Sequence, residues 1–140
     1  MARKYENVQL PDVLDLIYID GSDFMLDADY NCYWEEKGKE YRVRVPKGYV
    51  TDLSSIPRWA RSVIPVVGRQ NGPSVIHDYI YEPLSPQVGG GHQLRGWTKQ
   101  DADNLFLAAM KAAGVNWYRR NAMYLAVKFG GGRAWRTKNK

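Results

Sequence analysis

Three residues that can take part in proton transfer lie close together on a short predicted helix. Residues 72–81 are expected to be helical, since Pro73 suits a first helical turn. On such a helix His77 and Tyr81 are four positions apart and share one face, with Asp78 on the adjacent face. An imidazole beside a carboxylate and a phenol is typical of sites that perform acid–base chemistry.

A second carboxylate, Asp103, is expected on the apolar face of a later helix over residues 98–113. A carboxylate on such a face is unfavourable unless it is paired or hydrogen-bonded, and His77 with Tyr81 are suitable partners. An aspartate that accepts from one ring nitrogen fixes the tautomer, so that the other nitrogen can take a proton from water. The sequence therefore predicts a catalytic group of His77, Asp103 and Tyr81 that activates water to hydrolyse an ester.

Asp78 and Asp52 are the expected metal ligands. Asp78 would project into the cleft beside His77, where a carboxylate can hold a divalent cation that polarises a carbonyl. Asp52 would be a further ligand or a cap for the turn at Ser54. The structural alternatives are that Asp78 is a first-turn helix acid favoured by the dipole and that His77 is a core histidine satisfied by Asp103 or by a backbone carbonyl.

The residue inventory excludes several other kinds of site. Two histidines are too few for the metal phosphohydrolases that use several, and the glycines at 89–91 lack the lysine of a phosphate-binding loop. Cys32 is the only cysteine, so no internal disulfide forms and a reducing compartment is expected. No apolar run approaches the roughly 18 residues of a membrane span, and the first residues lack the apolar core of a signal peptide.

The net charge of +5 is concentrated at one end of the chain. From Lys111 to the C-terminus there are eight Lys or Arg residues and no acidic residue. Such an end favours contact with phosphates or with an acidic protein surface, and its alternative is a solvated segment without a specific partner. Nucleic acid is not an expected partner, because the basic and aromatic pattern at 133–136 is weak and short.

The alternation of apolar and polar residues predicts an α+β fold, with an N-terminal antiparallel sheet of hairpins followed by three to four helices. Residues 30–36 and 40–45 form the clearest hairpin, with its turn at 37–39. A short helix at 59–64 precedes the one that carries His77. The expected organisation is an arm at 1–12, one domain at 13–132 and a basic tail at 133–140.

The last predicted helix runs from a cap at Asn116 to Phe129. Its expected inward face consists of Tyr118, Ala122, Leu125, Ala126 and Phe129.

Two stretches, His77-Asp78-Tyr79-Ile80-Tyr81 and Ala102-Asp103-Asn104-Leu105-Phe106, resemble the His-Asp-x-x-Tyr motif and the later aspartate of phospholipase A2. The resemblance implies that His77 is the base, Asp78 the carboxylate that binds Ca²⁺, Asp103 the orienting acid and Tyr81 its hydrogen-bond partner. The nearest candidate for the glycine-rich calcium loop of those enzymes is at 67–72.

Nearly the whole chain also resembles a family of small proteins of unknown function from tailed bacteriophages and prophages. The match consists of the segment 45–58, which contains Gly-Tyr-Val-Thr-Asp-Leu-Ser-Ser-Ile-Pro, and the two motifs around His77 and Asp103. It implies a phage protein made in the host cytoplasm and expected to associate with the virion. We expect either a phospholipase-like hydrolase with a lipid substrate, or a tail, baseplate or neck subunit that assembles with other virion proteins or with itself.

Overall fold

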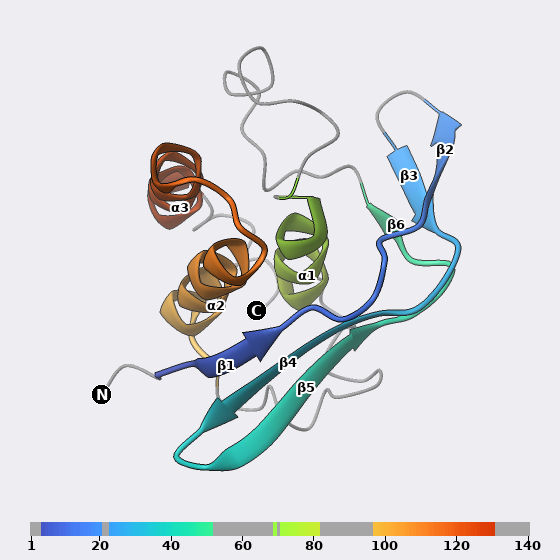
Figure 1. Cartoon of the computed structure of the whole chain (residues 1–140). Helices are drawn as coiled ribbons and strands as arrows, with labels where there is room; N and C mark the ends of the chain where they lie inside the picture. Colours follow the sequence, from blue (N-terminus) through green and yellow to red (C-terminus); the bar gives the residue numbers. More distant parts are fainter. Residues whose placement is uncertain (1–3, 21–22, 52–68, 70, 82–96, 131–140) are drawn as a thin grey trace.

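The structure is a computed structural model that describes residues 4–20, 23–51, 69, 71–81 and 97–130. Two three-stranded antiparallel sheets come first in the chain and three helices follow (Figure 1). The predicted α+β class, with sheet before helices, is therefore confirmed. The short helix expected at 59–64 lies outside the described residues.

The larger sheet has the strand order β1–β4–β5, where β1 is Glu6–Gln9, β4 is Tyr30–Glu36 and β5 is Lys39–Val45. Lys37 and Gly38 connect β4 to β5 with φ angles of 53° and 80°. A two-residue turn with both φ angles positive follows the twist of an antiparallel hairpin, which agrees with the predicted hairpin. The segment expected as an N-terminal arm contributes β1, which pairs with β4.

The smaller sheet has the order β2–β3–β6. Its strands are β2 (Leu16–Asp20), β3 (Asp23–Leu26) and β6 (Val50–Thr51). Phe24 of β3 pairs with Thr51 of β6, which places Thr51 at the edge of this sheet.

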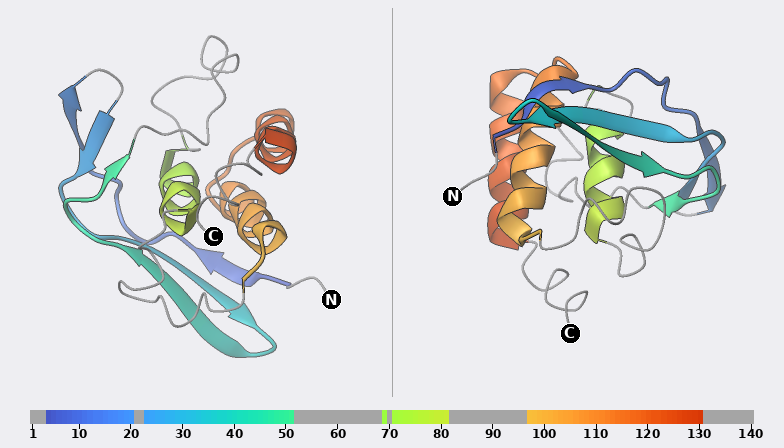
Figure 2. Two further views of the ribbon diagram at one scale, coloured as in Figure 1. Left: turned by 180° about the vertical axis from the view of Figure 1, so that it is seen from behind. Right: turned by 90° about the horizontal axis from the view of Figure 1, so that it is seen from below.

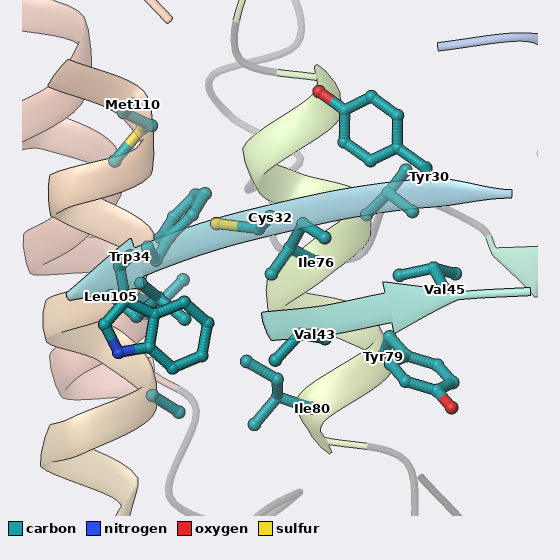
Figure 3. Close-up of a cluster of buried hydrophobic side chains, with 14 of the residues drawn as sticks. Tyr30, Cys32, Trp34, Val43, Val45, Ile76, Tyr79, Ile80, Leu105 and Met110 are labelled. Atoms are coloured by element: carbon teal, nitrogen blue, oxygen red, sulfur yellow. The ribbon is translucent and has the colours of Figure 1, made fainter. Parts of the chain in front are cut away.

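Helices α1 (Asn71–Tyr81) and α2 (Lys99–Ala112) lie side by side on one face of the larger sheet (Figure 2). Alternate residues of the hairpin point toward them and build the core between sheet and helices (Figure 3). In α1, residues 71–80 are all buried, so this helix is central to the fold. The core side chains contributed by the hairpin are Tyr30, Cys32, Trp34, Val43 and Val45.

Local sequence signals fix the ends of α2 as predicted. The Thr98 side chain accepts from the backbone of Asp101, and the Asp101 carboxylate accepts from the backbone of Thr98, which forms a capping box. Gly114 follows the helix with a φ of +83°, a conformation that glycine adopts without strain. Asp103 is buried on the inner face of α2, as predicted, together with Phe106, Ala109 and Met110.

The inward face predicted for the last helix, α3 (Trp117–Gly130), is wrong. Its buried residues are Met123 and Val127, whereas Tyr118 and Phe129 are about four-fifths exposed, at 80% and 79%. The helix packs chiefly against α2 (Figure 1), and Tyr118, Leu125 and Phe129 of its predicted face are exposed. Within the described part of the chain, the helices are too short or too polar to cross a membrane.

Candidate functional site

The contact predicted between His77 and Asp103 is present at the centre of the α1–α2 interface. The ring nitrogen Nε2 of His77 lies 2.8 Å from Oδ1 of Asp103. Both side chains are buried, with exposed fractions of 3% for His77 and 1% for the Asp103 side chain. The carboxylate oxygen at this distance fixes the orientation of the imidazole, as the sequence analysis expected.

Two further donors complete the hydrogen bonding of Asp103. The Tyr81 hydroxyl donates to Oδ1 at 2.7 Å, and the Lys99 ammonium donates to Oδ2 at 2.6 Å. We call His77, Tyr81, Lys99 and Asp103 the Asp103 cluster. Because all three partners of the carboxylate are polar and at bonding distance, the cost of burying its charge is offset.

The ionised state of Asp103 is favoured by these contacts. Burial by itself raises the pKa of a carboxyl group, because it removes water from the charged form. The hydrogen bonds from His77, Lys99 and Tyr81 outweigh burial and hold the pKa of Asp103 below its ordinary value. The pKa of Tyr81 is raised, first by burial and then by its hydrogen bond to Asp103, so this phenol stays a donor.

Lys99 also connects the cluster to α3. Its ammonium donates to the carbonyl oxygens of Val127 and Lys128, at 3.0 and 2.9 Å. These carbonyls belong to the last turn of α3, where a positive charge interacts favourably with the helix dipole. The Asp103 cluster therefore joins side chains of α1 and α2 to the backbone of α3.

The imidazole packs against two aromatic rings. The ring centroids of His77 and Tyr81 are 4.3 Å apart, and those of His77 and Phe106 are 4.7 Å apart. Rings at these distances restrict the rotation of the imidazole about its side-chain bonds. The orientation of His77 is therefore set both by a hydrogen bond and by packing.

The two expected metal ligands have different outcomes. Asp78 is 8% exposed, and its Oδ2 accepts a hydrogen bond from the Thr51 hydroxyl at 2.8 Å. Asp52 lies outside the described residues. Ca²⁺ takes six to eight oxygen ligands, and no group of three or more metal-binding side chains occurs in the described ranges. These residues by themselves do not make up a calcium site, and metal binding stays a prediction.

A partly open cavity of about 310 Å³ lies at the N-terminal end of α1. Tyr30, Gly72 and Arg69 contribute to its wall, together with apolar side chains. His77 is not among the residues that line this cavity, because it lies one and a half turns further along the helix. The cavity is therefore separate from the Asp103 cluster.

Two members of the site were missed in the sequence analysis, Lys99 and Thr51. Lys99 precedes Asp103 by four positions on α2, which is the usual spacing of an ion pair on a helix. This spacing is visible in the sequence and could have identified Lys99 as a partner of Asp103. Thr51 reaches Asp78 only because β6 pairs with β3, and no local pattern shows that arrangement.

Comparison with known proteins adds a family but no activity. No curated protein and no solved structure matches the chain. A family model described as "protein of unknown function (DUF1353)" matches residues 24–127, which extend from β3 to α3 and include the whole Asp103 cluster. The match covers well over half of the chain. The protein therefore belongs to the DUF1353 family of proteins of unknown function.

Proposed function

We propose that the protein is a small ester hydrolase in which His77 is the general base and Asp103 is the residue that orients it. The observation that carries the proposal is the 2.8 Å contact between Nε2 of His77 and Oδ1 of a fully buried, ionised Asp103. An aspartate in this position holds the imidazole in one tautomer and stabilises the imidazolium that forms during proton transfer.

In the proposed reaction His77 takes a proton from water through Nδ1 as the water oxygen attacks the ester carbonyl. The proton then passes to the alkoxide oxygen as the carbon–oxygen ester bond breaks, so that a carboxylic acid and an alcohol leave and the imidazole is neutral again. Tyr81 is a positioning residue, since its hydroxyl donates to the same carboxylate oxygen as His77. The proposal also includes the phage origin and the lipid substrate that the resemblance implies.

The test measures fatty-acid release from vesicles of phosphatidylglycerol and phosphatidylethanolamine, with added Ca²⁺ and with a chelator. We expect the wild type to release fatty acid and His77→Asn to lose at least about a hundredfold in rate, the lower limit for a general base. His92→Asn is the matched control, because it removes the only other histidine. Absence of activity in the wild type under both metal conditions, or full activity in a folded His77→Asn variant, would refute the proposal.

A second candidate is a non-enzymatic subunit of a phage tail, baseplate or neck, in which the Asp103 cluster is structural. It is favoured by the link from Lys99 to the Val127 and Lys128 carbonyls, because this link holds three helices together whether or not chemistry occurs. For this candidate we expect the protein in purified particles, and no ester hydrolysis.

A further inference from the structure

Among the described residues, one face of α3 is apolar and exposed at three of its four positions. Tyr118, Ala122, Leu125 and Phe129 recur at intervals of four, three and four residues, which places them on one side of the helix. We call these four residues the α3 stripe. Phe129 and Leu125 are 79% and 49% exposed, on the side of α3 opposite to buried Met123 and Val127. In Figures 1 and 2, α3 lies at the edge of the molecule.

Basic residues flank the stripe on both sides. At 100° per residue, Lys128 lies on one side of the stripe and Arg119 on the other. The Lys128 ammonium is 5.9 Å from the centre of the Phe129 ring, so the cation and the apolar surface are adjacent. No acidic residue occurs from Lys111 to the C-terminus. An exposed apolar stripe with a cation on either side and no acid is typical of helices that lie in the interface of a membrane.

We propose that the α3 stripe docks onto an anionic lipid surface, with its aromatic and aliphatic side chains in the headgroup region and Arg119 and Lys128 against lipid phosphates. A second copy of the chain is a less suitable occupant, because two α3 helices in contact would bring cations together without an acid to pair them. A bilayer presents negative charge over the whole length of about 21 Å that 14 helical residues span.

Binding of the α3 stripe to lipid does not depend on ester hydrolysis. Only its role in bringing the protein to a lipid substrate rests on the proposed function. None of the four residues of the Asp103 cluster belongs to the α3 stripe. Lys99 joins the cluster to the last turn of α3, so docking would hold the His77 helix at a defined distance from the bilayer.

The test is sedimentation of the full chain with vesicles, comparing phosphatidylglycerol–phosphatidylcholine mixtures with phosphatidylcholine alone. We expect binding to the anionic vesicles, weakened by high salt. Phe129→Asp should lower the affinity by about tenfold or more, since burying a phenylalanine side chain contributes about that factor. Val13→Asp is the matched control, because Val13 is 86% exposed and lies outside α3. Circular dichroism and thermal melting confirm that both variants fold.

Three results would overturn the proposal. One is the absence of binding to anionic vesicles. Another is salt-sensitive binding that Phe129→Asp leaves unchanged, which would assign the interaction to the basic residues alone. The third is a dimer in light scattering that Phe129→Asp abolishes, which would make a second copy the occupant. His77→Asn distinguishes the two proposals, since it should bind vesicles like the wild type while losing any hydrolysis.

Discussion

Replacing Asp103 with asparagine tests the physical basis of the whole site. In the wild type, Oδ1 accepts from His77 and Tyr81 and Oδ2 accepts from Lys99. Asparagine keeps the shape but has one acceptor oxygen and one donor group. If its oxygen serves His77 and Tyr81, its NH₂ group faces the Lys99 ammonium, so one charged hydrogen bond is replaced by two opposed donors.

The expected loss of stability follows from these contacts. Breaking a buried ion pair costs about 3–5 kcal/mol, and one hydrogen bond to a charged group contributes about 1.5–3 kcal/mol. Lys99 is 21% exposed and keeps two carbonyl acceptors, which limits the loss. We therefore expect Asp103→Asn to be less stable by about 3 kcal/mol at pH 7, as measured by urea unfolding.

The pH dependence provides an independent check of the same reasoning. Because the pKa of Asp103 is lowered on folding, its ionised form stabilises the fold fully above the unfolded value of 3.8. That stability is lost as the pH falls below 3.8 through the folded value. The difference in unfolding free energy between wild type and Asp103→Asn should therefore shrink on acidification.

Asp23→Asn is the matched control. Because Asp23 is exposed, this substitution should change the free energy of unfolding by less than about 0.5 kcal/mol. An Asp103→Asn variant as stable as the wild type at pH 7 would show that the buried charge is not held by these donors. A difference that stays constant between pH 7 and pH 3 would show that folding does not lower the pKa of Asp103.

Two substitutions and one thiol-reactivity measurement test separate parts of the structure. Tyr81→Phe removes one donor to a charged acceptor and should destabilise by about 1.5–3 kcal/mol in urea unfolding, with His77 still on Asp103. Gly72→Ala should destabilise by about 1–3 kcal/mol, because a Cβ there would lie 2.8 Å from the Tyr30 ring carbon Cζ; an unchanged melting temperature would contradict this. The thiol of buried Cys32, whose pKa burial raises to about 12, should react with a disulfide reagent only after unfolding.

The contact between His77 and Asp103 could be predicted because each residue carried a local signal. The spacing of the apolar residues placed Asp103 on the inner face of its helix, and burial of a carboxylate requires a partner. The hairpin at 30–45 and the capping box at Thr98 were equally visible, since both depend on residues close in sequence. Local patterns were sufficient wherever the interaction itself was local or where a charge had to be neutralised.

The orientation of α3 was mispredicted for a physical reason. The helix has apolar residues on two opposite sides, one with Met123 and Val127 and the other with the α3 stripe. Periodicity does not say which side faces the core when both are apolar. The choice is made by docking against α2, including the bonds from Lys99 to the α3 carbonyls, and these are long-range contacts. The same ambiguity left an apolar surface available for a partner.

The structural and catalytic interpretations of the Asp103 cluster place the same demand on the fold. The three hydrogen bonds to the buried Asp103 carboxylate form only when α1 and α2 are in one relative position, because hydrogen bonds allow little variation in distance and angle. Apolar packing alone does not fix the helices so precisely. A general base needs the same fixed imidazole. Loss of stability in a cluster variant therefore does not argue against catalysis, and the two interpretations are separated only where stability and rate change independently.

Tyr81→Phe is suited to this, because it removes a supporting bond while the His77 contact with Asp103 remains. For a structural cluster its effect ends at stability, whereas in a hydrolase it would also alter the dependence of the rate on pH.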